Sequence, residues 1–489
     1  MDTVLWTGIA MCAAPVGLGL ALVDGLGRGV SERTVRIVAE GVAAVVAVLL
    51  VRCWALSLPW PGPTMALGAL QVDFGGPVSG AGGWFALWGT AATWLALRAA
   101  RDYLHREPGY PRFQAGLLVF LGALLLVSLS DDLLGIFLGW ELFGVSSAML
   151  IGWRTARHEA AMSGLAAWLY NRVGDAGFLL ALGAAWAASH TTSLSALAHD
   201  PPSLLPSAVL GIGLALAAVA KSGLPPFSPW ISSAVEGPTP SSALYYAAVM
   251  VHAGPVLMLR LGNDSLARAA ASPWLLCAGA AALVWGTWVA AATSDIKRSL
   301  VHAGVAQGGL IAIELALGWD DVALVHAIGH GTLRGWQVLR APSWRDLVAD
   351  GAAASWAPRA AVWLKVNPHQ AADGLGLRAW VQRAFVAPLV AASRSWARMD
   401  AEFVDAPSDL MRVRTAGHLP PVEAVLDRAA AWADGVEARV FHAALFEGVP
   451  ALAQRVGQAL GRLDDALRLS WVAPAIVLGL LALALGGVA

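Results

Sequence analysis

The chain has 489 residues, of which 57% are hydrophobic and only 13% are charged, and its mean hydropathy is +0.63. Soluble domains carry about 25% charged residues, so this composition indicates a membrane protein. The formal net charge of −1 offers no basic footprint for a nucleic acid. Cys12, Cys53 and Cys277 lie far apart without CxxC spacing, which gives no sign of a disulfide framework, a zinc site or an iron–sulfur site.

Windows of about 20 apolar residues predict an all-α polytopic protein with about twelve transmembrane helices. The first window has no basic n-region and no clear cleavage signal after it, so it is predicted to be a mature helix. The predicted spans are 4–24, 37–57, 82–100, 113–130, 132–153, 161–189, 203–224, 241–262, 272–293, 299–317, 319–340 and 470–488.

Arginines in the early connections predict how the chain crosses the membrane. Basic residues follow the first, third and fifth spans, and none lie between spans two and three or directly before span five. By the positive-inside rule, the arginine-rich connections face the cytoplasm and both termini lie outside, in a cell (inner) membrane. Lys297 fits this orientation, whereas Arg268 falls on the wrong side.

Residues 341–469 depart from the apolar pattern. Their later part has apolar residues at spacings of 3 and 4 with charges on the other face, which predicts an amphipathic helix. Such a helix lies on the membrane surface or along a partner, and a soluble helical hairpin is the alternative. The predicted parts are N-terminal transmembrane helices (1–110), a core (111–340), this cytoplasmic or interfacial segment (341–469) and a last transmembrane helix (470–489).

Lys221 lies near the end of a long apolar run and is followed at once by SGLPPFSPW. A cation at the bilayer centre costs roughly 2.5 to 3.5 kcal/mol on insertion scales, so such a residue usually marks an ion path, a relay or a ligand counter-ion. Pro225 and Pro226 remove backbone donors and clash with the preceding turn, so we expect the helix to break there. Freed carbonyls can then hold water beside Lys221, and burial favours its neutral form, which suits proton exchange.

Further ionisable residues lie inside apolar runs. Glu141 stands in the middle of one predicted span, and the adjacent Trp140 is expected to shape its pocket. Arg172 and Asp175 are expected to form a buried pair that supports Glu141. By contrast, Asp131 and Asp132 are expected to be solvated in a short loop.

His326, His330 and Arg334 follow one another at four-residue intervals, which stacks them on one face of a helix. Imidazoles titrate near neutral pH, so this face is interpreted as a proton relay, with satisfied core histidines as the alternative. Arginine stays protonated, so Arg334 is assigned an electrostatic role rather than proton transfer.

Several strings together resemble the antiporter-like membrane subunits of respiratory complex I, in particular the subunit L type of NADH-quinone oxidoreductase. They are FLGWELFGVSSAMLIGW, YNRVGDAG, AVAKSGLPPFSPWISSAVEGPTPSSAL, TSDIKRSLVHAGVAQGGL and ALVHAIGHGTLRGW. The resemblance covers residues 110–340, and the tail only loosely. It implies two inverted five-helix repeats with broken helices, a lateral-type helix in the tail, and a pairing of Glu141 with Lys221. A static ion pair between two helices is the alternative role for that pair.

The chain departs from this family at three places. The position of Arg334 is usually a lysine, and a histidine is usual where Tyr246 stands, whereas His252 lies six residues further on. Residues 341–469 contain no convincing span for a second broken helix. We therefore expect the first half-channel to be intact and the second to be completed by a partner subunit.

The sequence predicts a proton-translocating, antiporter-type subunit of a larger complex I-like assembly. We find no GxGxxG motif and no cysteine cluster, so no cofactor, metal site or catalytic residue is predicted, and redox chemistry is expected elsewhere. Expected partners are other membrane subunits, the bilayer and protons or Na⁺. The proton-translocating residues are predicted to be Glu141, Lys221, His326, His330 and Arg334, supported by Trp140, Arg172, Asp175, Pro225, Pro226, Tyr246, Asp295 and Lys297.

Two alternatives stay open. The related family includes sodium/proton antiporter subunits and membrane partners of inorganic-carbon uptake systems, so the chain is alternatively the membrane half of an energy-coupled bicarbonate or carbon dioxide uptake system. A purely structural membrane scaffold is the third interpretation. Asp295, Lys297 and Arg298 form a DIKR motif that is expected to anchor a cytoplasmic helix start and to act as a coupling element.

Overall fold

The computed structural model describes residues 13–25, 30–62, 64–67, 70–107, 109–154, 157–293 and 295–341, together with residues 377, 380, 383, 384, 387, 388 and 391. Most of the predicted segment 341–469, and the predicted span 470–488, lie outside the described residues. The longer helices are α2 (Ala13–Gly25), α3 (Glu32–Ala55), α4 (Gly80–Tyr103), α5 (Tyr110–Leu129), α6 (Leu133–Ile151), α7 (His158–Ser189), α9 (Leu204–Lys221), α12 (Ala253–Leu261), α13 (Leu266–Ala292), α14 (Ile296–Ala316) and α15 (Asp320–Arg340).

Shorter elements connect or interrupt these helices. An antiparallel hairpin is formed by β1 (Thr64–Leu67) and β2 (Leu70–Asp73). The others are α8 (Leu194–His199), α10 (Ser228–Ala234), α11 (Thr239–Ser242), the π-helix η1 (Ala243–Ala248) and the 3₁₀-helix η2 (Met250–His252).

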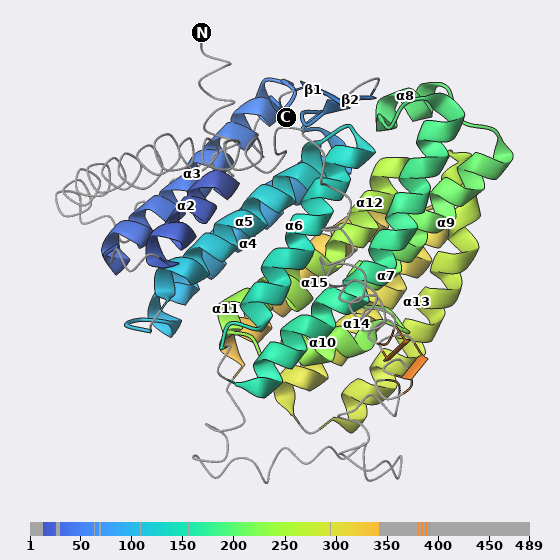
Figure 1. The fold of residues 1–489 in the computed structure, drawn as a ribbon. Helices are drawn as coiled ribbons and strands as arrows, with labels where there is room; N and C mark the ends of the chain where they lie inside the picture. The colour runs from blue at the N-terminus through green and yellow to red at the C-terminus, as the bar shows by residue number, and fades with distance from the viewer. Residues whose placement is uncertain are drawn as a thin grey trace, which may run out of the picture.

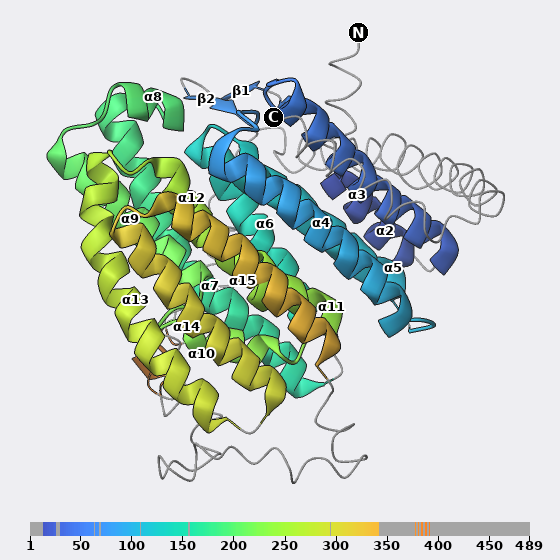
Figure 2. The same ribbon diagram turned by 180° about the vertical axis from the view of Figure 1, so that it is seen from behind.

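The long helices run side by side in one bundle, with α2 to α5 along one flank and α6 to α15 forming the rest (Figures 1 and 2). Large apolar side chains in mid-helix face outward, such as Leu180 at 64% exposure and Val284 at 67%, as expected of a surface in contact with lipid. Seven helical stretches among the described residues are long and apolar enough to cross a membrane: Glu32–Ala55, Tyr110–Leu129, Leu133–Ile151, Leu204–Lys221, Thr239–Leu261, Leu266–Ala292 and Ile296–Ala316.

All seven coincide with predicted spans, which confirms the polytopic all-α class. The helices α4, α7 and α15 also lie where spans were predicted, although they are not among the seven. The total of twelve spans stays a prediction.

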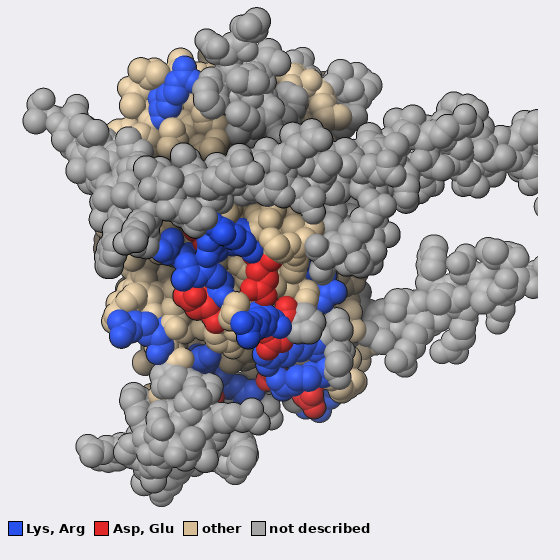
Figure 3. Space-filling view, turned by 90° about the vertical axis from the view of Figure 1, so that its left-hand side faces the viewer, with Lys and Arg blue, Asp and Glu red and all other residues tan. Residues whose placement is uncertain are grey.

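The connections alternate between two ends of the bundle. At one end, the turn between α5 and α6 meets the hairpin and α8, since the Asp131 amide donates to the Gly75 carbonyl at 3.0 Å and the Leu194 amide to the Asp131 carbonyl at 2.7 Å. At the other end, the turn after α4 contacts the start of α3 through Glu32. On the face seen in Figure 3, most positive and negative side chains gather in one region, and a further positive patch lies apart from them near the top of the view.

Arg268, the exception to the predicted charge rule, is buried. Only 1% of its side chain is exposed, and its guanidinium forms an ion pair with Asp320 at 2.8 Å. It also donates to the carbonyls of Met258 and Leu315. An arginine neutralised inside the bundle has no free charge for lipid headgroups, which explains why it does not follow the rule.

Asp132 corrects the expectation of a solvated loop, because it is 1% exposed. It is the N-cap of α6: one carboxylate oxygen accepts from the Leu134 amide at 2.7 Å, and the other accepts from the Thr192 hydroxyl at 2.8 Å. Burial raises the pKa of Asp132, and these hydrogen bonds oppose that effect. Through these hydrogen bonds Asp132 connects the start of α6 to the segment that follows α7.

We predict that Asp132→Ala lowers the free energy of unfolding by about 2 kcal/mol, because it removes a helix cap and leaves the buried Thr192 hydroxyl without its acceptor. Asp132→Asn should keep most of the stability, since its amide oxygen can still accept both hydrogen bonds. The comparison is made by thermal unfolding of the purified protein in detergent. Equal melting temperatures for the alanine variant and the wild type would contradict this role.

Candidate functional site

The helix break predicted from the proline pair is present directly after Lys221. Helix α9 ends at Lys221, the chain leaves the helix through residues 222–227, and α10 begins at Ser228. Gly223 has a φ of +61°, and a Cβ there would lie 1.9 Å from Ile231 Cδ1, so only glycine fits this turn. Trp230 Nε1 donates to the Ala220 carbonyl at 3.0 Å, which satisfies one of the backbone acceptors freed at the end of α9.

Lys221 lies in the interior with 1% of its surface exposed. Its ammonium donates to the Trp140 carbonyl at 3.1 Å and lies 4.8 Å from the centre of a Trp140 ring, a cation–π distance. Trp140 is fully buried, so both contacts hold the amine within the protein. The prediction placed Trp140 in a pocket around Glu141, and the structure shows that it contacts Lys221.

Arg172 lies between the two carboxylates that were singled out from the sequence. Its guanidinium forms an ion pair with Glu141 through Nη1, and its Nη2 lies 2.9 Å from Asp175 Oδ2. The expected Arg172–Asp175 pair is therefore present. The direct Glu141–Lys221 pair implied by the resemblance is not: Arg172 is the ion-pair partner of Glu141, and among the described residues no carboxylate forms an ion pair with Lys221.

The two cations nevertheless share one small space. A Cβ on Gly144 would lie 3.2 Å from Arg172 Nη2 and 3.7 Å from Lys221 Nζ, so both side chains converge on this glycine of α6. Glu141 and Asp175 both act electrostatically on the Lys221 ammonium. The arrangement is a four-membered cluster of two cations and two anions, in which Arg172 mediates between the carboxylates.

Several polar atoms of this cluster are buried without a hydrogen-bond partner among the described residues. They include Glu141 Oε1 and Arg172 Nε, whereas Asp175 Oδ2 is ion-paired with Arg172 Nη2 at 2.9 Å. Buried polar atoms in proteins are usually hydrogen-bonded to protein or to ordered water, so this set of atoms is suited to ordered water. Water next to ionisable groups is what a proton path requires.

A second group of ionisable residues lies along α15, and the structure confirms that they share one face of this helix. The rings of His326 and His330 are 6.2 Å apart, and Arg334 Nε lies 3.4 Å from His330 Nε2. His326 Nδ1 lies 2.9 Å from a carboxylate oxygen of Glu314, and its Nε2 lies 3.0 Å from Gln307 Oε1. The histidines of α15 thus connect to polar side chains on α14.

His252 extends this row toward Lys221. Its Nε2 lies 3.1 Å from His330 Nδ1, within hydrogen-bond distance, and its other ring nitrogen contacts the Ala248 carbonyl. Tyr246, His252, His330 and Ser222 all line a cavity of about 10 Å³, close to the roughly 10 to 15 Å³ that one water needs. Ser222, the residue after Lys221, therefore lines the same cavity as the two histidines, whereas Lys221 itself is not among the lining residues.

Sequence reasoning missed Glu314, Gln307 and the role of His252. Glu314 could have been found, because it is an acid inside the apolar run LIAIELALG, and it is only 7% exposed. Asp295 and Lys297 lie elsewhere. Asp295 caps the start of α14 by accepting from the Arg298 amide at 2.8 Å, which confirms the predicted helix start, and Lys297 donates to the Thr239 hydroxyl at 3.0 Å.

Residues 130–344 match the model of a transmembrane family described as NADH:quinone oxidoreductase/Mrp antiporter. These residues are similar to that family's membrane part, and we call them the antiporter-type domain. This domain contains Glu141, Lys221, His326, His330 and Arg334, so both polar groups lie inside it.

Curated relatives are similar in sequence to about half of this chain. NADH-ubiquinone oxidoreductase chain 5 of Hylobates lar is 36% identical over 242 residues, and the same protein of Bos indicus is 35% identical over 240 residues. Each alignment covers 49% of this chain and 39% of the relative, so the chain matches about two fifths of the relatives' length.

Solved structures show the same fold. A chain of the Mrp complex from Dietzia sp. superposes with a TM-score of 0.58 at 22% identity, covering 69% of this chain and 37% of that one. A chain of the membrane-bound sulfane sulfur reductase, an archaeal respiratory membrane complex, gives a TM-score of 0.58 at 18% identity, covering 68% of this chain and 55% of that one. These superpositions show the fold, and the seven apolar helices together with the transmembrane family model indicate a multi-pass membrane protein.

Proposed function

We propose that this chain conducts protons across a membrane as an antiporter-type subunit of a larger, complex I-like assembly. The observation that carries the proposal is Lys221: a buried amine at a helix break, converging on Gly144 with the Arg172 guanidinium that pairs with Glu141 and Asp175, inside an antiporter-type domain. Ionisable residues at membrane depth are rare unless they serve a path for ions or protons. The names of the relatives and of the two solved complexes support an assembly with other membrane subunits.

The proposed path has two parts. The cluster of Glu141, Arg172, Asp175 and Lys221 loads and unloads the lysine, because movement of Arg172 between the carboxylates changes the charge that the amine faces. The cavity beside Ser222 then passes the proton to the row formed by His252, His330, His326 and Glu314. Arg334 holds a fixed positive charge beside His330 in this row, and the break at Pro225 and Pro226 gives water access to backbone carbonyls.

The finer architecture is part of the same proposal. We infer about twelve spans, arranged as inverted five-helix repeats in which α9 and α10 form the broken helix of the first repeat. The arginine-rich end faces the cytoplasm of a cell membrane, and both termini lie on the other side. A neighbouring subunit supplies what the second half-channel lacks. The row of imidazoles supports protons over Na⁺ as the transported ion, because imidazole nitrogens relay protons at neutral pH.

The test is proton flux along a pH gradient in vesicles that contain the purified protein with its copurifying subunits. We predict that Glu141→Gln lowers this flux about tenfold and does not abolish it, since Asp175 still contacts Arg172 and still faces Lys221. The double variant Glu141→Gln with Asp175→Asn should lower it much further. A single variant that conducts like the wild type would contradict the role of the carboxylate, and Na⁺ flux in place of proton flux would correct the ion.

A further inference from the structure

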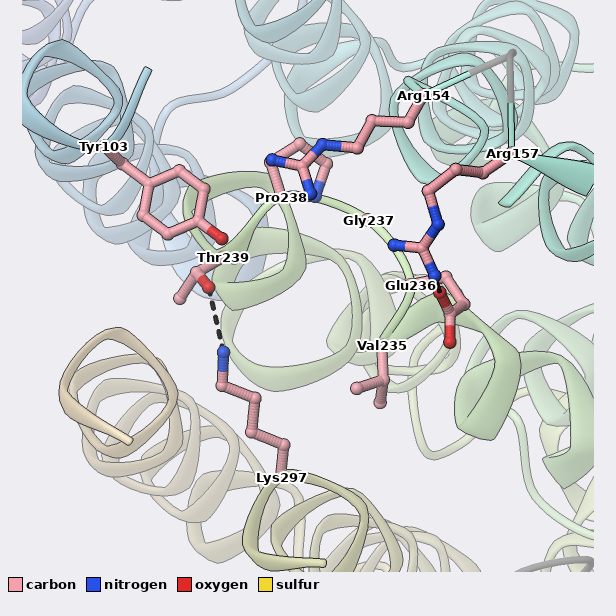
Figure 4. A pocket seen from close by; sticks show the side chains of 9 residues that line it. All are labelled: Tyr103, Arg154, Arg157, Val235, Glu236, Gly237, Pro238, Thr239 and Lys297. Carbon is pink, nitrogen blue, oxygen red and sulfur yellow. Dashed lines mark hydrogen bonds and ion pairs between the residues drawn. The ribbon is translucent and has the colours of Figure 1, made fainter. Parts of the chain in front are cut away.

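A cation-lined pocket lies at the arginine-rich end of the bundle, apart from the buried polar path. It is formed where α4 ends at Tyr103, where the connection between α6 and α7 carries Arg154 and Arg157, and where α14 begins near Lys297. Its floor is the turn from α10 to α11, with Glu236, Gly237, Pro238 and Thr239. Figure 4 shows the side chains of Arg154, Tyr103 and Lys297 reaching toward Pro238 and Thr239 from three sides.

The pocket has an excess of positive charge. Glu236 is its one carboxylate, and it is already paired with Arg157 at 3.2 Å. Among the described residues, the Lys297 ammonium has only the Thr239 hydroxyl, at 3.0 Å, as a hydrogen-bond partner. The Arg154 guanidinium has no hydrogen bond or ion pair with any residue that the structure describes. Arg154 and Lys297 therefore face the pocket without an anionic partner. A cluster that only held the helices together would not require these unpaired charges.

The chemistry of the lining selects an oxyanion. Guanidinium and ammonium groups only donate hydrogen bonds, and arginine matches phosphate oxygens with two parallel donors. The pocket volume is about 150 Å³, below the roughly 300 to 1,000 Å³ of pockets that enclose whole organic ligands. It fits one phosphate-sized group whose remainder stays outside.

The position of the pocket indicates where that group comes from. The pocket opens where the membrane-length helices α6 and α14 end or begin, which under the proposed function is the level of the lipid headgroups. Basic pockets between transmembrane helices on the cytoplasmic side are suited to anionic lipid headgroups. We propose that this pocket binds the phosphate of an anionic phospholipid and thereby ties the turn after α10 to α4, α6 and α14. This site is separate from the proposed proton path.

The test uses the full-length chain purified in detergent with its copurifying subunits. Binding of phosphatidylglycerol, of neutral phosphatidylcholine and of inorganic phosphate is compared by native mass spectrometry and by the shift in melting temperature. We expect the wild type to bind one phosphatidylglycerol that R154Q/K297Q binds at least about tenfold more weakly. The matched control R101Q/R106Q, which removes two arginines at the same end but outside the pocket, should bind like the wild type.

Each outcome decides the proposal. If inorganic phosphate shows the same dependence on Arg154 and Lys297 while phosphatidylglycerol does not bind, the phosphate site stands and its source is soluble. If R154Q/K297Q binds both ligands as the wild type does, the proposal is wrong. Loss of a copurifying subunit with unchanged lipid and phosphate binding would overturn it in favour of an acidic protein segment. R154K/K297R keeps both charges and should keep binding, which separates loss of the site from misfolding.

Discussion

Lys221→Met is expected to reduce proton flux through reconstituted vesicles on the order of 100-fold, the size of effect that loss of a positioned proton-transfer group produces. Methionine has nearly the length of lysine and no ionisable group. Lys221 is the only ionisable residue of α9, so nothing else on this helix can take its place. The path would then be interrupted between the carboxylate cluster and the cavity at Ser222.

The variant should remain folded, because Lys221 forms no ion pair with a described carboxylate and its replacement leaves Glu141 and Asp175 both paired with Arg172. Arg98→Met is the matched control: it removes a partly buried cation on α4 that pairs with Glu40 at 3.5 Å, away from the polar path. Its flux should equal that of the wild type. Lys221→Arg separates charge from proton exchange, since arginine keeps its proton. Wild-type flux in folded Lys221→Arg would show that Lys221 is an electrostatic element only.

The positions of the helices and the break in α9 could be predicted from the sequence because both depend on local chemistry. An apolar window reports which residues can lie in lipid, and a proline pair interrupts a helix whatever surrounds it. The shared face of His326, His330 and Arg334 follows in the same way from the four-residue spacing on a regular helix. None of these inferences depends on which helices are neighbours in the fold.

The partners of Glu141 could not be predicted in this way. Hydropathy places Glu141 and Lys221 at membrane depth, but it does not predict which side chains from other helices lie between them. The structure brings Arg172 of α7 toward Gly144 of α6, where the missing side chain leaves room for a guanidinium beside the amine. A glycine one turn from a buried acid is a weak signal in a sequence with 52 glycines.

The role of His252 could not be predicted for a different reason. The sequence shows only that His252 lies six residues beyond Tyr246, and residues six apart on a regular helix point to different faces. The structure replaces regular helix with the π-helix Ala243–Ala248 and the 3₁₀-helix Met250–His252. These turns change the phase of the side chains, and both Tyr246 and His252 line the same cavity. Irregular turns of this kind leave no clear pattern in the sequence.

We predict that His330→Ala lowers proton flux on the order of 100-fold, because His330 contacts both His252 and His326 and its removal opens a gap in the row. His252→Ala should lower it by a similar factor, since no other described residue is within hydrogen-bond distance of His330 on the side of the cavity. His199→Ala, which removes an exposed histidine of α8, is the control and should conduct like the wild type. Flux is again measured in vesicles along a pH gradient.

The double variant His252→Ala with His330→Ala tests whether protons pass the two histidines in series or by separate routes. If protons pass His252 and His330 in series, either gap already limits the flux, and the double variant conducts no less than the slower single variant. Effects that multiply would instead assign the two histidines to independent steps. That result would contradict the proposed connection between Lys221 and α15 through the cavity at Ser222. It would do so even if Lys221 itself proved essential. The proton would then have to reach Glu314 without crossing the contact between the rings of His252 and His330.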